Sequence, residues 1–220
     1  MKPIAEILES VVDSMRDSTN ITSITLISGT EYKIQLDKSI NLTFQNDYIN
    51  ITTATINKDF KVESVGEDYF TIKSLETLSD EVGNYTNYAP YFDYEYFDYE
   101  ARELTGKNKT LDKFKKFPLI FLNYDFEEDR KKTNRTTDLT IFIFDKTKES
   151  YLMKTRNELT FPKLRTITEK FLSQLKTSHY IFNIGDYNYK ELPYRLNNLN
   201  SVVDAIELNL NEIIFTNCNK

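Results

Sequence analysis

Two apolar runs, Phe117-Pro118-Leu119-Ile120-Phe121-Leu122 and Leu139-Thr140-Ile141-Phe142-Ile143-Phe144, decide the fold of this chain. In the second run, alternate residues from Leu139 onward fall on one face of a strand, and the residues between them fall on the other. Both faces are mostly apolar and are dominated by β-branched and aromatic residues, which is typical of a strand buried on both sides. The polar segment 127–137 between the runs is predicted to be a loop.

A helix over residues 162–176 and a strand over residues 179–184 are predicted to follow. Pro162 suits the first turn of this helix, because its fixed φ is already helical and its missing N–H costs no hydrogen bond there. Apolar residues recur at helical spacing behind it, so one face of the helix is expected to pack on the sheet. The predicted core of this part contains Leu139, Ile141, Phe142, Ile143, Phe144, Leu164, Ile167, Phe171 and Leu172. Such a core indicates an α+β domain.

Shorter elements are predicted around this core. Residues 101–105 are expected to form a short helix, and residues 149–152 a short strand. Residues 187–200 are polar and are predicted to be a loop. The segment 205–215 begins as an alternating strand and is expected to continue after a β-bulge.

The N-terminus carries an amphipathic pattern over residues 3–16, with Pro3 in the first turn. Its apolar positions recur at helical spacing: Ile4, Ile7, Leu8, Val11, Val12 and Met15. Such a stripe either covers the core of the chain itself or docks on a neighbouring subunit.

Residues 20–75 are typical of consecutive short strands separated by turn residues. The expected strands cover residues 21–27, 32–36, 40–44, 48–52, 60–65 and 69–72. Regular short strands of this kind indicate a small barrel or sandwich, which is usually a binding or oligomerisation module. The predicted organisation is therefore an α+β core domain, residues 1–19 and 76–220, interrupted by a small β-barrel-like module, residues 20–75.

Composition excludes several classes of protein. The formal net charge of −6 argues against a dedicated nucleic-acid binder, which normally carries a basic surface. The single cysteine, Cys218, cannot form a disulfide within the chain. No stretch approaches the about 20 apolar residues of a membrane span, and Glu6, Glu9 and Asp13 interrupt any secretory pattern at the N-terminus.

The segment 85–99 is far more aromatic than an ordinary loop, and acidic residues alternate with its rings. Tyrosine supplies a large contact area at low entropic cost, so this predicted aromatic loop is a candidate for a subunit or partner interface. The candidate interface residues are Tyr85, Tyr88, Tyr91, Phe92, Tyr94, Tyr96, Phe97 and Tyr99. Two other interpretations stay open: the loop packs its rings over its own domain, or Asp93, Glu95 and Asp98 hold a cation.

Catalytic chemistry is hard to find in the sequence. The chain has one histidine, His179, and its one cysteine is the third residue from the end, so neither a nucleophile–base pair nor a zinc site is indicated. A carboxylate pair is the remaining option, with Glu127, Glu128 and Asp129 as the obvious cluster and Asp93 as a further candidate. We predict no enzyme, no catalytic residue, no metal and no cofactor.

The order of several motifs resembles neck proteins of tailed bacteriophages, including crAss-like phages of Bacteroidetes hosts. The motifs are Pro90-Tyr91-Phe92, Glu103-Leu104-Thr105-Gly106-Lys107, Lys116-Phe117-Pro118-Leu119-Ile120, Asp125-Phe126-Glu127-Glu128 and Val203-Asp204-Ala205-Ile206-Glu207-Leu208. They are loose, contain no catalytic signature and cover about residues 88–215. Neck proteins of this class are head–tail connector, ring or tail-completion (terminator) subunits.

The resemblance implies a tail-terminator-like α+β fold and a structural role in the virion neck. Subunits of this class form homo-oligomeric rings that contact the portal and the adjacent neck and tail ring proteins, and DNA passes through the channel without specific binding. The chain would be made in the host cytoplasm, with no membrane involved. The alternative is a small protein-binding module, host-directed or regulatory, that uses the aromatic segment.

Overall fold

The computed structural model describes residues 3–98, 103–105, 117–130, 134–148, 150–196 and 201–216, with only the backbone of residues 95–98, 103–105, 130, 193–196 and 201–202. The chain divides into two compact units. One unit is Arg16–Ala89, and the other combines Met1–Met15 with Pro90–Lys220. The α+β class predicted from the sequence is confirmed.

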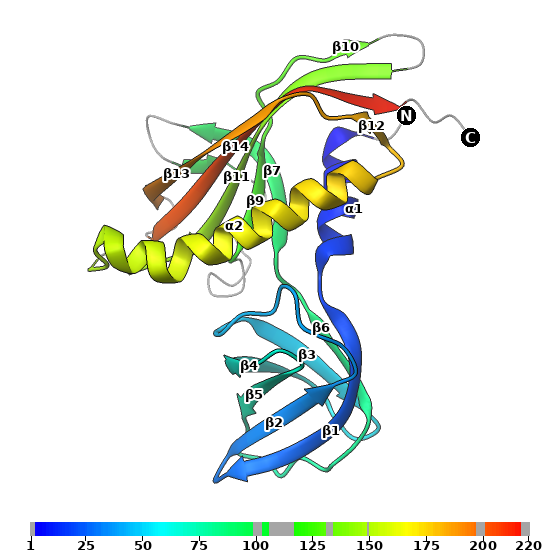
Figure 1. Cartoon of the computed structure of the whole chain (residues 1–220), viewed down its shortest axis with the longest axis vertical. Helices are drawn as coiled ribbons and strands as arrows, with labels where there is room; N and C mark the ends of the chain where they lie inside the picture. Colours follow the sequence, from blue (N-terminus) through cyan, green and yellow to red (C-terminus); the bar gives the residue numbers. More distant parts are fainter. Residues whose placement is uncertain are drawn as a thin grey trace. The chain divides into compact units, whose positions relative to one another are not determined.

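The first unit is a closed barrel of six antiparallel strands in the order β1-β2-β5-β4-β3-β6 (Figure 1). The strands are β1 (Ser18–Ser28), β2 (Glu31–Leu36), β3 (Tyr48–Thr53), β4 (Asn57–Val65), β5 (Tyr69–Lys73) and β6 (Gly83–Asn87). Alternate residues of each strand point inward and form one apolar core. The barrel closes only because β6 pairs with both β1 and β3, so this unit extends past residue 75, where the predicted module ended.

The strand predicted over residues 40–44 is wrong, and side chains explain why. The Asp17 Oδ2 atom accepts a hydrogen bond of 2.6 Å from the Leu42 amide. The buried Asn87 amide donates to the Leu42 carbonyl at 3.1 Å and to Asp47 Oδ2 at 3.3 Å. Because side chains satisfy this backbone, the segment needs no strand partner.

The second unit is a mixed sheet with two helices. Its elements are α1 (Ile4–Met15), β7 (Tyr91–Asp98), β8 (Glu103–Thr105), β9 (Leu119–Asn123), β10 (Asp129–Arg130), β11 (Asn134–Lys146), α2 (Met153–Thr177), β12 (Ile181–Asn183), β13 (Tyr187–Leu196) and β14 (Ser201–Thr216). The strand order is β12-β14-β11-β9-β7-β8, with β13 also on β14 and β10 on β11. The β7–β9 pair is parallel and the other pairs are antiparallel.

The two apolar runs form the centre of this sheet, as predicted. Phe121 of β9 lies opposite Phe142 of β11, and every residue of β9 is buried. Phe142 and Phe144 stack at 5.5 Å between ring centroids. Every predicted core residue of β11 and α2 is buried.

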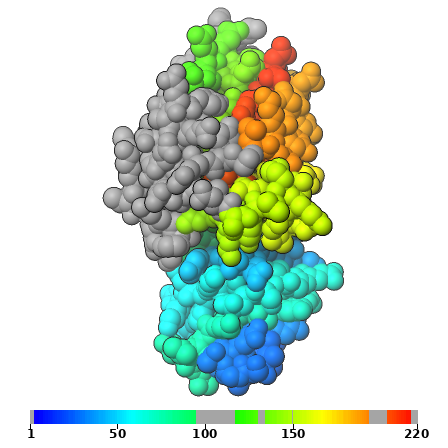
Figure 2. Space-filling view, turned by 90° about the vertical axis from the view of Figure 1, so that its left-hand side faces the viewer, coloured from blue at the N-terminus to red at the C-terminus, as the bar shows by residue number. Residues whose placement is uncertain are grey.

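The helices cover one face of the sheet, where α2 contacts β11, β14 and α1 (Figure 1). In Figure 2 the surface of α2, in yellow, lies against the orange segment that follows it and contains β12. The apolar stripe of α1 is confirmed as a helix, and all of its members are buried. The stripe is therefore used within the chain, as core cover.

The predicted start of the second helix is wrong. The helix begins at Met153, and Pro162 lies inside it rather than in its first turn. Residues 150–152, predicted as part of a strand, precede the helix without strand pairing. A buried ion pair between Arg156 and Asp204 of β14 holds the early turns of α2 on the sheet. The free energy gained from this contact exceeds the cost of the backbone hydrogen bond that Pro162 cannot donate.

Two other expectations change. The polar loop predicted over residues 187–200 is wrong for its first ten residues, which form β13 and pair with β14 along their whole length. Residues 103–105, expected in a helix, form β8. The predicted bulge is confirmed, because Asn211 and Glu212 both lie opposite Asp138, and Glu212 has a φ of 52°.

Candidate functional site

The structure divides the predicted interface segment between the two units. The single aromatic loop expected over residues 85–99 is wrong, because Gly83–Asn87 is β6 of the barrel and Tyr91–Asp98 is β7 of the sheet. Tyr85 is a core residue of the barrel, with its ring edge-on to Phe70 at 5.1 Å. Burial raises the pKa of the Tyr85 phenol well above its usual value.

The other candidate interface residues of segment 85–99 differ in how much of each side chain is exposed to solvent. The Tyr88 hydroxyl donates to Asp59 Oδ1 at 3.4 Å, and Tyr91 packs partly buried against the core between β9, β11 and β14. Tyr96 and Phe97 lie on β7, of which only the backbone is described there. Tyr99 lies outside the described residues.

Four rings of the sheet unit form a continuous series that we call the aromatic row: Phe92, Tyr94, Tyr124 and Phe126. The centroid distances along it are 6.2 Å, 6.0 Å and 4.9 Å. All three fall within the range of favourable aromatic pairs. The middle rings are the most exposed, with 44% of Tyr94 and 52% of Tyr124 accessible to solvent. The row therefore keeps apolar area available on its outer side.

The backbone explains why these residues meet. Phe92 and Tyr94 are two apart on β7 and so share one face of the sheet. Tyr124 and Phe126 follow the end of β9, which is the parallel neighbour of β7. Sequence reasoning missed the second pair, although the alternation in Asn123-Tyr124-Asp125-Phe126 continues the pattern of β9 and was the signal that could have found it.

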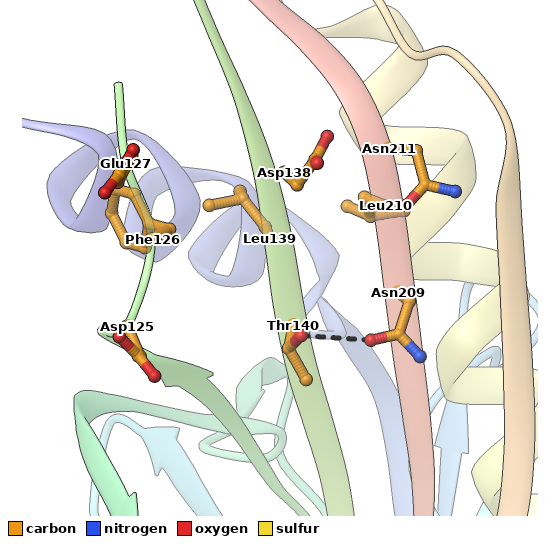
Figure 3. A pocket seen from close by; sticks show the side chains of 9 residues that line it. All are labelled: Asp125, Phe126, Glu127, Asp138, Leu139, Thr140, Asn209, Leu210 and Asn211. Carbon is orange, nitrogen blue, oxygen red and sulfur yellow. Dashed lines mark hydrogen bonds between the residues drawn. The ribbon is translucent and has the colours of Figure 1, made fainter. Parts of the chain in front are cut away.

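A polar pocket of about 260 Å³ adjoins the Phe126 end of the aromatic row. Nine residues line it: Asp125, Phe126, Glu127, Asp138, Leu139, Thr140, Asn209, Leu210 and Asn211. Figure 3 shows Phe126 and Leu139 pointing toward one another, and the Thr140 hydroxyl donating to Asn209 Oδ1 at 3.0 Å. The carboxylates of Asp125, Glu127 and Asp138 give the pocket an acidic character.

Residues at the β-bulge, Asp138 and Asn211, form part of the lining of this pocket. The Asp138 Oδ1 atom accepts a hydrogen bond of 2.7 Å from the Glu212 amide, which the bulge turns out of the strand ladder. The Thr137 hydroxyl donates to the Glu127 carbonyl at 2.7 Å and holds the segment after β9 against β11. These two hydrogen bonds connect the segments that line the pocket.

The chemistry of the pocket is that of recognition through carboxylates, amides and one hydroxyl. Of the carboxylates considered for catalysis, only Glu127 lines it. Glu128 lies 3.6 Å from the Arg135 guanidinium, and Asp93 Oδ1 accepts a hydrogen bond of 2.9 Å from the Tyr94 amide. The His179 ring lies 3.8 Å from the Tyr180 ring, tilted by 41°, and does not line this pocket.

The described residues contain no group of three or more His, Cys, Asp or Glu side chains placed to hold a metal ion. The predicted cation site at Asp93, Glu95 and Asp98 stays a prediction, because the side chains of Glu95 and Asp98 are outside the description. Cys218 is outside it as well.

Comparison with protein-family models, with curated protein sequences and with solved structures found no match. Over the described residues, neither helix is long and apolar enough to cross a membrane.

Proposed function

We propose that this chain is a structural virion protein that forms an oligomeric ring in the neck of a tailed phage. In this proposal it connects the portal and head to the tail, contacts the adjacent ring proteins, lines the DNA channel and catalyses no reaction. The motif order over about residues 88–215 supports the neck location by resemblance. The observation that carries the assembly role is the aromatic row, with Tyr94 and Tyr124 each about half exposed.

The aromatic row has the properties of a protein contact. Its rings are already ordered by one another, so an approaching partner buries apolar area at a small further cost in conformational entropy. Tyrosine and phenylalanine are enriched at the centres of protein interfaces, and each ring that becomes fully buried adds hydrophobic stabilisation. The adjoining acidic pocket offers hydrogen-bond acceptors at the rim of such a contact.

The charge of the chain supports free passage of DNA. Affinity for DNA follows the number of phosphates that Lys and Arg neutralise, and this chain carries 34 acidic against 28 basic side chains. An acidic lumen would let DNA slide without sticking. A channel lined with Lys and Arg would contradict this part of the proposal.

A small protein-binding module is the second candidate, because the same aromatic row would serve a host partner equally well. The two functions differ in the state of the free protein. A ring subunit forms closed oligomers, whereas a binding module stays a monomer or dimer until it meets its partner.

Mass photometry of the purified chain over a range of concentrations tests the proposal. We expect a closed oligomer, and we expect the double variant Tyr94→Ser/Tyr124→Ser to shift the population toward monomer. Leu159→Ser and Phe182→Ser are matched controls, because these side chains are 59% and 73% exposed and lie outside the aromatic row. Monomers at every concentration, or an equal loss of assembly in the controls, would contradict the proposal that the aromatic row is a subunit contact.

A further inference from the structure

Six short polar side chains form a continuous array on the outer surface of the barrel. They belong to β1, β6, β3 and β4, which are consecutive neighbours in the barrel (Figure 1). Cross-strand pairing places four of them in one row and two in the adjacent row. Five of the six are exposed, and the sixth, Asn50, is half-buried. We call this set the amide–hydroxyl array: Asn20, Asn84, Thr52 and Asn57 in one row, and Thr86 and Asn50 in the next.

The composition of the array departs from what a strand surface needs. Asparagine is depleted in β-strands, yet it supplies all but two members of the array. The outward residues of β2, outside the array on the same barrel, are Glu31, Lys33 and Gln35, which are ordinary for a solvated strand. A strand preference that is broken at paired positions of four neighbouring strands indicates a function rather than a requirement of folding.

Hydrogen bonds order the array before any ligand arrives. The Thr52 hydroxyl donates to Asn50 Oδ1 at 2.8 Å, and the Asn50 amide donates to Asn57 Oδ1 at 3.3 Å. At the other end of the row, the Asn20 amide donates to Asp37 Oδ2 at 2.7 Å. A ligand therefore meets side chains whose rotamers are already restricted, which lowers the entropic cost of binding.

The hydrogen-bonding capacity of the array matches that of sugars. Each member both donates and accepts, because a side-chain amide carries an NH₂ and a carbonyl group and a hydroxyl group does both. The hydroxyl groups of a sugar have the same double capacity. Tyr48 lies two residues from Asn50 on the same side of β3 and is partly exposed, so its ring offers apolar area to the C–H face of a sugar ring.

The charge and polarity of the array exclude two other classes of ligand. None of its members is Lys or Arg, whereas affinity for nucleic acid depends on the neutralisation of phosphates by these residues. The next outward residues of β4, Asp59 and Lys61, carry opposite charges that offset each other. None of its members is a large apolar residue, whereas the centre of a protein interface is apolar and aromatic.

We propose that the amide–hydroxyl array binds a neutral polysaccharide. The array lies on the convex outer side of a closed barrel, so a polymer that lies across the strands can contact both rows. Neighbouring strands are about 4.8 Å apart, so the row of four extends over about 14 Å. Several sugar units laid along it would exchange hydrogen bonds with every strand. This function is independent of the ring, because the array belongs to the barrel unit and the aromatic row to the sheet unit.

Native affinity electrophoresis of the full-length chain tests this site. Each gel contains one polysaccharide: dextran, galactomannan, arabinoxylan or xyloglucan as neutral polymers, and alginate or heparin as anionic ones. We expect at least one neutral polymer to slow the chain. Asn84→Val/Thr86→Val should raise the dissociation constant at least about ten-fold, because valine suits a strand but removes the amide and the hydroxyl. Lys33→Val/Gln35→Val on β2 is the matched control and should change it less than about two-fold.

The remaining outcomes overturn the proposal. They are no retardation by any neutral polymer, retardation by the anionic polymers alone, and an equal loss of binding in the β2 control. The thermal unfolding midpoint shows whether each variant is folded. If Asn84→Val/Thr86→Val does not fold, Thr52→Val takes its place, because it removes one exposed hydroxyl of the array and should weaken binding a few-fold. Unchanged binding by Thr52→Val would then contradict the proposal.

Discussion

The Arg156 guanidinium on α2 pairs with the Asp204 carboxylate on β14, and both side chains are buried. Arg156 also donates from its Nε to the Tyr151 carbonyl at 3.0 Å, which ties the turn before α2 to the same pair. This contact attaches the early turns of the long helix to the sheet. It explains why the helix extends well ahead of Pro162.

Breaking this pair from one side should strongly destabilise the sheet unit. Arg156→Met leaves the Asp204 carboxylate buried without its counter-charge, and we expect a loss of about 3–5 kcal/mol in the free energy of unfolding. Urea denaturation followed by circular dichroism measures it. The double variant Arg156→Met/Asp204→Leu removes both charges and should recover much of the loss. If the double variant were no more stable than the single one, the pair would not be the source of the effect.

The barrel should lose stability in alkaline solution because of Tyr85. Its pKa is raised above the value of 10.0 expected in the unfolded chain, mainly by burial, so the folded state keeps the proton that the unfolded state releases. This contribution is complete below pH 10 and decreases as the pH rises above it. Thermal unfolding between pH 8 and pH 11 should show a smaller decrease in Tm for Tyr85→Phe than for the parent chain. Equal slopes would contradict the assignment.

The bulge at Glu212 should tolerate glycine and reject a β-branched residue. Its φ of 52° costs an L-amino acid about 1–2 kcal/mol, a cost that glycine does not carry. We expect Glu212→Gly to be neutral or mildly stabilising and Glu212→Val to destabilise by about 1–2 kcal/mol. Glu207→Val, at a regular position of the same strand, is the control and should cost less. Equal effects at both positions would exclude backbone strain as the cause.

The polar network at Asn87 should control the segment between β2 and β3. Asn87→Ala leaves the buried acceptors Leu42 O and Asp47 Oδ2 without this donor, at about 1–3 kcal/mol. Hydrogen exchange should become faster in residues 40–47, and the centre of the barrel should change little. Unaltered exchange over residues 40–47 would show that other contacts hold the segment.

The spacing of apolar residues in the sequence predicted the helices and strands whose burial follows from their own side chains. The apolar runs at β9 and β11 and the stripe of α1 specify burial directly, and all were found. Pairing between distant segments decides the rest. In the part of the sheet that the structure describes, β13 pairs with β14 alone, so residues 187–196 can be polar, and only their register with β14 distinguishes them from a loop. Likewise, β6 is short and polar, and only the need to close the barrel identifies it.

For the same reason, only half of the aromatic row could be predicted from the sequence. Phe92 and Tyr94 belong to a conspicuous aromatic segment, whereas Tyr124 and Phe126 join them only through the parallel β7–β9 pairing. Tyr85 belonged to that segment by sequence and to the barrel core by structure. Only the tertiary structure shows that neighbouring residues of this segment belong to the barrel core in one case and to the aromatic row in the other.

Cryo-EM of the assembly from which this chain is purified is the first test of the proposed ring. We predict several copies in a closed ring around an axial channel, with Tyr94 and Tyr124 buried at a subunit contact. A single copy, or a symmetric assembly in which both rings still face solvent, would contradict it.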